Sequence, residues 1–407
     1  MLNRIKSFLR HDRGSEKKGS LFMNCLVIGM NPTVDRTIRL KEKLQIGSVY
    51  HPDDVREEVG GSGINAATVM ARFGEDIKYI GFVGGERGHR VRDKLREEGM
   101  QAMLVETEAQ TGICTRIIDC DGNTMEINEL GGPIKSAEYD RFLDIINREI
   151  STDIPQFALL CGSLPQGVDI TVLKKLIRRL NRSRVNVIAD LPGELLCEIL
   201  GSRDCKLFMI KPNVSELYKL YEKERDTDRE MVKKMLDLTE EDFYLDRKAE
   251  RFAVRLFNKY GTNILGTLGP KGSFYVSECV EIETKTLTVT EVNRIDGAGD
   301  VYLGCFLYAC NGDFDKIPQL EYAIRAATSA ATVYISKVPD GLPRASEMGR
   351  YMHKLQPRIR PRDPKEVRRK RRKMKRVAAM KMKIKKKEVG VATGNPGNPV
   401  NKEKTEE

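Results

Sequence analysis

The segment Gly297-Ala-Gly-Asp300 places small residues and an acid directly before an apolar run of helical composition, Val301 to Tyr308. Glycines before a helix let the backbone approach a ligand closely, and the first free N–H groups of that helix bind anions. An aspartate there accepts a proton from a hydroxyl while the N–H groups neutralise charge on a transferred phosphoryl group. A glycine turn with an N-capping aspartate has the same composition, so the segment alone leaves both interpretations open.

Three other segments join glycine or polar residues to the start of a helix or the end of a strand. The glycine turn at 60–65 ends in Asn65, whose amide offers a donor and an acceptor to sugar hydroxyls. The segment at 211–216 carries an amide and a carboxylate three residues apart, on one helix face, and such oxygen ligands suit Mg²⁺ held partly through water. The glycine turn at 267–272 has a form that underlies nucleotide phosphates and ribose. Each signal is weak by itself.

The elements that position these segments alternate between strands and helices from residue 24 to about 355. Apolar runs predict strands at Cys25–Met30, Ile77–Val83, Phe157–Cys161, Val185–Asp190, Leu207–Ile210 and Asn263–Leu268. Amphipathic patterns predict helices at Ile64–Phe73, Glu86–Glu98, Thr171–Asn181 and Lys248–Tyr260. This alternation is typical of βαβ units and of a parallel sheet covered by helices on both faces.

Residues 36–55 and 111–128 interrupt that alternation, because both read as strands without an intervening helix. They predict a small antiparallel sheet that projects from the main one and acts as a lid over the ligand. The highly charged stretch 222–246 predicts a solvated helical insertion.

Composition permits a globular enzyme: 407 residues, 40% hydrophobic and 32% charged, are enough for a large core. Tryptophan is absent and aromatics reach only 6%, which argues against an aromatic stacking surface for single-stranded nucleic acid. Nine scattered cysteines without a CxxC pair indicate reduced thiols and a cytoplasmic protein. No apolar run is long enough for a membrane span or a secretory signal. The GxxxxGK[ST], HRD and DFG signatures are absent, which excludes P-loop and protein kinases.

The net charge of +11 belongs to one region of the chain. Residues 356–387 carry +15, so the remainder sums to −4. We predict a domain at 24–355 and a basic, disordered tail at 356–407, which either solubilises the protein or binds RNA, DNA or anionic lipid. Residues 1–23 are predicted to be an extension. Either translation begins at Met23, or the segment Ile5–Leu9 forms a short amphipathic arm.

Together and in this order, the motifs resemble the phosphofructokinase B (PfkB)/ribokinase family over residues 24–355. The resemblance narrows to the branch of 1-phosphofructokinase and tagatose-6-phosphate kinase through the segments Asn31-Pro-Thr-Val-Asp35, Thr115-Arg116, Glu126-Ile-Asn128 and Cys161-Gly-Ser-Leu-Pro165. It implies an α/β fold with a ribokinase-like, doubly wound and mostly parallel sheet flanked by helices, together with a small β-sheet lid. It also implies ATP and Mg²⁺ as cofactors and a homodimer formed through the lid.

Carried over position by position, the resemblance makes Asp300 the catalytic base. It implies an anion hole formed by Gly297, Ala298 and Gly299. The residues implied to bind the sugar are Asp35, Gly61, Asn65, Arg116 and Ser163. Arg116 would contact a phosphate already on the sugar, as an arginine fork is shaped to do. The ATP side is implied to consist of Lys211, Asn213, Glu216, Thr267, Gly269 and Gly272, with Asn213 and Glu216 also holding the metal through water.

Departures from the family pattern bear on the substrate. Ser62 stands where many relatives have lysine, and Ser48 and Tyr50 follow the Gly47 turn where this branch commonly has a basic residue. Two phosphate contacts are therefore expected to be missing. Arg294 and Asp296 replace small or apolar residues, and we expect them to pair with each other rather than Arg294 replacing a lost phosphate contact.

The sequence thus predicts an ATP-dependent phosphotransferase that acts on the alcohol group of a ketohexose phosphate. The product is fructose 1,6-bisphosphate if the enzyme resembles 1-phosphofructokinase. A 6-phosphofructokinase or tagatose-6-phosphate kinase activity is a variant of the same prediction. Two alternatives stay open: a ribokinase-type kinase of an unphosphorylated sugar or nucleoside, and a weakly catalytic sugar-phosphate sensor or RNA-associated protein that works through the tail.

Overall fold

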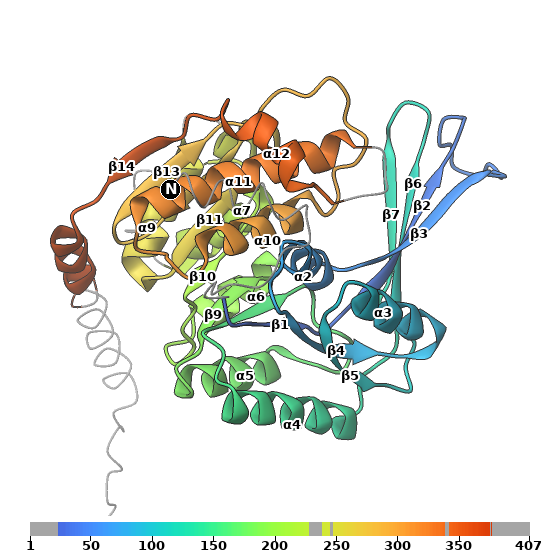
Figure 1. Ribbon diagram of the computed structural model, residues 1–407, viewed down its shortest axis with the longest axis horizontal. Helices are drawn as coiled ribbons and strands as arrows, with labels where there is room; N and C mark the ends of the chain where they lie inside the picture. The colour runs from blue at the N-terminus through green and yellow to red at the C-terminus, as the bar shows by residue number, and fades with distance from the viewer. Residues whose placement is uncertain (1–22, 228–237, 245–246, 338–341, 375, 377–407) are drawn as a thin grey trace, which may run out of the picture.

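A computed structural model describes residues 23–227, 238–244, 247–337, 342–374 and 376. Its main feature is a ten-stranded sheet in the order β14-β13-β12-β11-β10-β9-β8-β1-β4-β5, with helices on both faces (Figure 1). Seven neighbouring strands of this sheet, β11, β10, β9, β8, β1, β4 and β5, pair in parallel. At the other edge, β12, β13 and β14 extend the sheet with antiparallel pairings. The mostly parallel, doubly wound α/β sheet predicted from the sequence is confirmed.

Six strands of this sheet, β1, β4, β8, β9, β10 and β11, match the predicted apolar runs to within two residues, whereas β5, β12, β13 and β14 were not predicted. Their bounds are β1 Cys25–Gly29, β4 Lys78–Val83, β5 Gln101–Glu106, β8 Phe157–Cys161, β9 Asn186–Asp190, β10 Met209–Ile210, β11 Asn263–Thr267, β12 Ser273–Val276, β13 Val280–Thr284 and β14 Arg358–Pro361. Successive side chains enter opposite cores: Leu26 and Ile28 of β1 pack on one face, and Cys25 and Val27 on the other. Burial on both faces explains why central strands such as β1 and β8 are continuous apolar runs.

Helices cover the two faces in two groups. One core lies under α2 Ser62–Arg72, α3 Gly85–Glu97, α10 Ala298–Cys310, α11 Ile317–Ser336 and α12 Ala345–Met352. The other lies under α4 Ser136–Thr152, α5 Ile170–Arg182, α6 Gly193–Leu200, α7 Val214–Thr227 and α9 Lys248–Tyr260. Short 3₁₀ turns occupy Glu241–Tyr244 and Gly269–Lys271. None of the helices in the described ranges is long and apolar enough to cross a membrane.

The helices α2 and α10 cross at very close range, which decides where the site forms. A Cβ added to Gly304 of α10 would lie 2.5 Å from the carbonyl oxygen of Ala66 in α2, so only glycine fits there. Gly63 of α2 is close to β1 in the same way, since its Cβ would lie 3.2 Å from Cα of Gly29. These contacts bring the beginnings of α2 and α10 to the carboxyl end of β1.

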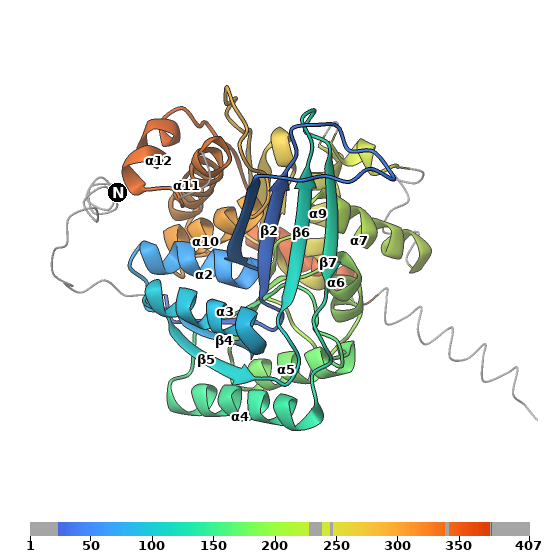
Figure 2. The same ribbon diagram turned by 90° about the vertical axis from the view of Figure 1, so that its right-hand side faces the viewer.

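A second sheet of four strands, which we call the small sheet, projects from the body in Figure 1 and is seen face-on in Figure 2. It consists of β2 Thr33–Arg39, β3 Asp54–Gly60, β6 Gly112–Ile118 and β7 Thr124–Glu129, in the order β3-β2-β6-β7. The prediction of an antiparallel sheet is wrong for one pairing, because β2 and β6 run parallel. Between them the chain passes through the main sheet and returns in the same direction, as a parallel pairing requires.

The folded part of the chain extends beyond the predicted domain end at residue 355. Strand β14 pairs with β13 after residue 355, and Arg360 forms an ion pair of 3.3 Å with Glu281. Residues 364–374 are helical, and Val367 is buried in the second core. The sequence did not show this because β14 is held by backbone pairing and ion pairs rather than by an apolar run. At the other end, Met23 packs in the first core.

Several predictions concern residues outside the described part of the chain. These are the extension up to residue 22, most of the tail from residue 377, and residues 228–237 and 245–246 of the charged stretch. Within the described part of that stretch, Glu224 is buried and accepts hydrogen bonds from Lys259 and Tyr260, so it is not a solvated position. The contact of the tail with RNA or another polyanion stays a prediction.

Candidate active site

The beginnings of α2 and α10 form the centre of the candidate site. Gly61 and Gly297 cap these helices with φ values of 100° and 76°, which glycine adopts without strain. A Cβ at Gly297 would lie 2.7 Å from the hydroxyl of Tyr334 and 3.2 Å from Nδ2 of Asn65. A larger residue there would push the two helix starts apart, and with them the N–H group of Gly299. The N–H of Ala298 donates to the carbonyl of Ile295 over 3.2 Å.

Asp300 lies in the first turn of α10 and faces α2. Its Oδ2 accepts a hydrogen bond of 2.9 Å from Nδ2 of Asn65. Burial and, after it, the nearby carboxylate of Asp190 raise the pKa of Asp300 to about 6, against the opposing effects of Lys211 and of hydrogen bonds from Asn65 and Ser62. Ser62, which stands where many relatives have lysine, therefore helps to hold this carboxylate. A group with such a pKa is ionised at neutral pH and is still a proton acceptor.

Lys211 and Asp190 form a buried ion pair beside the beginning of α10. Nζ of Lys211 lies 3.0 Å from Oδ1 of Asp190, and both side chains are less than a tenth exposed. A Cβ added to Gly299 would lie 3.5 Å from the same Nζ, so the ammonium group faces the turn that precedes Asp300. Burial opposes the charge on Lys211, but Asp190, Glu216 and Asp300 outweigh it and raise its pKa. One cation thus balances several acids at the carboxyl ends of β9 and β10.

Asn213 and Glu216 hold each other at the beginning of α7. The N–H of Asn213 donates to Oε2 of Glu216, and the N–H of Glu216 donates to Oδ1 of Asn213, each over 2.9 Å. Burial raises the pKa of Glu216 to about 7, even though the charge of Lys211 opposes the rise. Thr267 ends β11 beside this turn, because its N–H donates to the carbonyl of Pro212 over 3.1 Å. The predicted residues at 211–216 and Thr267 therefore lie together.

Gly269 and Gly272 form the tight turn between β11 and β12, as the sequence predicts. Their φ values are 53° and 119°. A Cβ at Gly272 would lie 2.0 Å from the carbonyl oxygen of Thr284. Backbone approach therefore requires glycine at this position.

The small sheet presents Asp35 and Arg116 from neighbouring strands. Cross-strand register places Asp35 opposite Cys114, and Arg116 opposite Glu126. Because alternate residues share a face, Asp35, Cys114, Arg116 and Glu126 lie on one face of the sheet. Burial raises the pKa of Asp35, while hydrogen bonding by Thr33 and the charge of Arg116 lower it. This polar face turns toward the beginning of α10.

Arg116 is the link between the small sheet and α10. Its guanidinium donates to Glu126 over 2.8 Å and forms an ion pair with Asp296, four residues before Asp300. The expected pair of Arg294 with Asp296 is wrong. Arg294 instead pairs with Glu58 over 2.9 Å and stacks on the ring of Tyr334 at 4.4 Å, because the turn directs Asp296 toward the more deeply placed Arg116. Ser163, also predicted for the sugar, accepts a hydrogen bond of 2.9 Å from Asn31 after β1.

Sequence reasoning missed two groups at this site. Asp190 was only the last residue of a predicted strand, although an acid at the carboxyl end of a buried parallel strand is itself a signal. Its Oδ2 is buried and has no hydrogen-bond partner among the described residues. Asp296 was noted as a departure, but its pairing with Arg116 depends on the position of the small sheet. No pattern along the chain specifies that position.

The fold, with acidic and basic groups arranged around Asp300, indicates a known family of enzymes. Residues 29–345 match the model of the pfkB family carbohydrate kinases, and the chain belongs to that family. It is therefore a phosphotransferase with an alcohol group as acceptor, and the family implies ATP as phosphoryl donor. The chain is 29% identical over 315 residues to a 1-phosphofructokinase of Haloferax volcanii, covering 77% of this chain and 93% of that protein.

Solved structures agree with the fold. A structure of phosphofructokinase-2 from Escherichia coli, in complex with substrates and products, matches 81% of this chain and 99% of its own with a TM-score of 0.68 and 20% identity. A ribokinase from Thermotoga maritima matches 82% of this chain and all of its own with a TM-score of 0.60 and 20% identity. The ribokinase-like fold predicted from the sequence is confirmed.

Proposed function

We propose that this kinase transfers the γ-phosphoryl group of ATP to a hydroxyl of a ketohexose phosphate, with fructose 1-phosphate as the favoured substrate. The observation that carries the proposal is the contact between Arg116 of the small sheet and Asp296, which brings a phosphate-binding guanidinium next to the helix start that holds Asp300. The relative named 1-phosphofructokinase supports this choice of substrate. Fructose 6-phosphate and tagatose 6-phosphate are the nearest variants.

In this mechanism Asp300 accepts the proton of the sugar hydroxyl that attacks the γ-phosphate. Asn65 and Ser62 fix the carboxylate, and the raised pKa makes it a stronger base than an exposed aspartate. The N–H groups of Gly297 and Gly299 neutralise charge on the phosphoryl group, and that of Ala298 joins them when it leaves the carbonyl of Ile295. Lys211 adds a cation beside them. Positioning and charge neutralisation supply most of the acceleration, since phosphoryl transfer has a loose, charge-rich transition state.

The sugar lies between α2 and the small sheet in this proposal. The residues that bind its hydroxyls are Asp35, Gly61, Asn65 and Ser163. Arg116 binds the phosphate already present, which requires the ligand to replace Asp296 or to use the N–H groups that the two acids leave free. The small sheet then acts as the lid that excludes water from the transferred group.

ATP occupies the other side, along Lys211, Asn213, Glu216, Thr267, Gly269 and Gly272. The donor set fits a hydrated Mg²⁺: Asn213 and Glu216 would hold the ion through water, and the unpartnered buried oxygen of Asp190 provides a further acceptor. No cluster of three metal-binding side chains occurs in the described ranges. When bound, the ion supplies charge neutralisation at the phosphates.

A second copy of the chain is proposed to cover the outer face of the small sheet. Register places Ile38, Val55, Ile117 and Met125 in one row across the four strands, with Ile127 on the same face. Val55, Met125 and Ile127 are between 42% and 52% exposed, which is unusual for apolar side chains clustered on one sheet face. The polar face carries the substrate residues, so dimerisation through the apolar face leaves them accessible.

All nine cysteines are free, which supports a cytoplasmic location.

A substrate screen tests this proposal. Purified full-length protein is assayed for ADP release with fructose 1-phosphate, fructose 6-phosphate, tagatose 6-phosphate, fructose, ribose and adenosine. We expect kcat/KM for one ketohexose phosphate to exceed that for every unphosphorylated acceptor by at least about tenfold, the equivalent of one good hydrogen-bonded contact. A preference for ribose, fructose or adenosine would replace the proposal by the ribokinase-type alternative. Absence of ADP release above the sugar-free rate would favour the sensor.

A further inference from the structure

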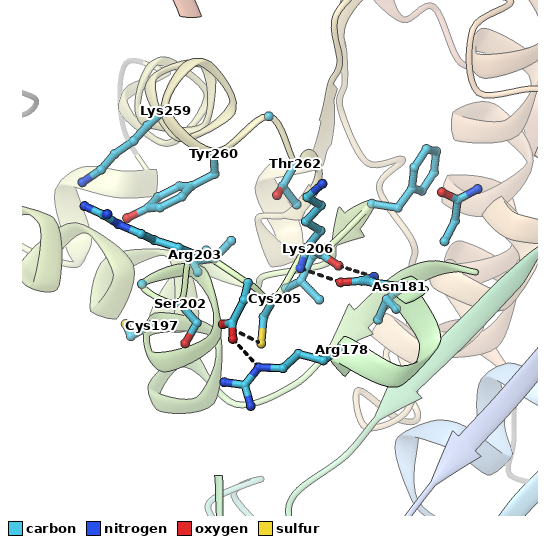
Figure 3. A pocket seen from close by; sticks show the side chains of 18 of the residues that line it. Arg178, Asn181, Cys197, Ser202, Arg203, Cys205, Lys206, Lys259, Tyr260 and Thr262 are labelled. Carbon is cyan, nitrogen blue, oxygen red and sulfur yellow. Dashed lines mark hydrogen bonds and ion pairs between the residues drawn. The ribbon is translucent and has the colours of Figure 1, made fainter. Parts of the chain in front are cut away.

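A second pocket lies at the other end of the strands that carry the catalytic groups. It has a volume of about 1300 Å³ and is shown in Figure 3. Its wall includes Asn186 at the beginning of β9, Phe208 directly before β10 and Thr262 directly before β11. Asp190 ends β9 four residues after Asn186, a rise of about 13 Å along the strand. The pocket is thus separate from the candidate active site.

Basic residues dominate the rim of this pocket. The lining contains two acidic residues, Asp204 and Glu224, against eight basic ones: Arg178, Arg182, Arg184, Arg203, Lys206, Lys223, Lys259 and Arg371. Both acids are already engaged, Asp204 by Arg178 over 2.5 Å and Glu224 by Lys259. The surplus of positive charge in a concave, partly apolar site concentrates a positive potential that attracts anions.

Four of these cations have no partner in the described ranges. The charged groups of Arg182, Arg184, Lys206 and Lys223 form no hydrogen bond or ion pair with a described residue, and all four residues are exposed at the rim. They originate from three separate segments: the end of α5, the loop before β10, and α7. Convergence of unpaired cations from distant parts of the chain costs repulsion, which an anionic ligand relieves.

The floor of the pocket is apolar. Leu200, Cys205, Leu207 and Leu220 are buried beneath it, and Tyr260 contributes an aromatic ring to one wall. In Figure 3, Arg203, Lys259 and Tyr260 line the same side of the hollow. A ligand that fits has anionic groups for the rim and a ring or other apolar body for the floor.

The beginning of the basic tail completes the pocket. Arg371, from the helix at 364–374, stacks over the ring of Phe257 with 5.5 Å to the centroid. A Cβ added to Gly261 would lie 1.6 Å from Nη2 of Arg371, so the arginine needs a glycine beneath it. Part of the positive charge of the tail is therefore built into this site.

We propose that this pocket is a second, non-catalytic site for a nucleotide-sized organic phosphate, a molecule with two or more phosphate groups on a ring-bearing body. The rim binds the phosphates and the apolar floor receives the ring. The apolar floor favours this ligand over RNA, because it lies in a concave site of about 1300 Å³ with room for a ring-bearing small molecule. Salt weakens the interaction, since its cations lie at the surface.

Isothermal titration of the full-length protein with ADP tests the proposal. The wild type is expected to bind one more equivalent than the double variant Arg182→Ala/Arg184→Ala, or to bind it at least tenfold more tightly. The matched control Arg148→Ala/Arg350→Ala removes the same charge outside the pocket and should behave as the wild type. A fold check by circular dichroism accompanies each variant. The variant leaves the candidate active site unchanged, so the comparison holds whether or not that site binds ADP.

Equal ADP stoichiometry and affinity in the wild type and the pocket variant would overturn the proposal. Two further arms identify the ligand chemistry. Tripolyphosphate that binds as tightly as ADP, with the same dependence on Arg182 and Arg184, would overturn the requirement for a ring-bearing body. Binding of poly(U) RNA that depends on both arginines, without a second ADP equivalent, would replace the small ligand by RNA.

Discussion

Charged side chains are buried and paired at one end of strands β9, β10 and β11, whereas four at the other end are exposed and unpaired among the described residues. At the carboxyl ends, Asp190 and Lys211 are buried and bonded to each other, with Asp300 and Glu216 close by. At the amino ends lies the pocket of Figure 3, which we call the basic pocket, and the unpaired charged groups of Arg182, Arg184, Lys206 and Lys223 on its rim are exposed. Burial raises the pKa values of Asp300 and Glu216 to about 6 and about 7. The difference indicates chemistry at one end and reversible anion binding at the other.

The largest expected effect is at Asp300. Asp300→Asn keeps the side-chain volume and the contact with Asn65 but removes the base, so we expect kcat to fall by about 10²–10⁴-fold. Binding of ATP should change by less than about twofold, because the nucleotide side is left intact. Steady-state kinetics and titration with a non-hydrolysable ATP analogue measure the two quantities. Retention of a tenth of wild-type kcat would show that the carboxyl-end site is not organised around this residue.

The next effect concerns stability. Lys211→Met leaves Asp190 buried without its cation, and we expect a loss of about 3–5 kcal/mol in the free energy of unfolding. Arg184→Ala, at the basic pocket, removes an exposed unpaired charge and should change stability by less than about 0.5 kcal/mol. Denaturant unfolding of both variants compares the two ends directly. Similar losses would contradict the contrast between buried pairing and exposed charge.

A smaller effect is expected at the small sheet. Arg116→Ala should raise KM for the phosphorylated sugar by about tenfold or more, with little change for an unphosphorylated sugar or for ATP. Asp296→Asn should lower KM for the same phosphosugar by about two- to threefold, because it releases one N–H edge of Arg116. Initial-rate measurements over both substrates separate these effects. An equal increase for both sugars in Arg116→Ala would mean that the arginine only supports the sheet.

Much of the main sheet was predictable from the sequence because its strands are buried on both faces. Phe157–Cys161 and Lys248–Tyr260 have the predicted bounds, and the other predicted elements differ by one or two residues at most ends. The glycine turns at 60–65 and 297–300 were recognised because close backbone approach permits no side chain. Strand β14 was missed since edge pairing and ion pairs leave no apolar periodicity.

The partners within the site were harder to predict than its location. Arg116 pairs with Asp296, and Arg294 with Glu58, because the small sheet approaches α10 at an angle that local patterns do not encode. The basic pocket combines residues from α5, α7, the loop before β10 and the tail helix, segments that are far apart in the chain. The sequence showed only the positive charge of the tail and none of the other basic residues of the pocket. Its connection with the pocket needed the fold.

The dependence of kcat/KM on pH, measured for the wild type and Asp300→Asn, tests the central claim most directly. The pKa of Asp300 is raised to about 6, so wild-type activity should fall about tenfold per pH unit below that value as the base becomes protonated. Because a raised pKa means that protonation favours the folded state, this group adds stability as the pH falls from 6 toward 4, and its titration does not unfold the protein. The residual activity of Asp300→Asn should lack this dependence. The same acid limb in both proteins would show that another group is the base.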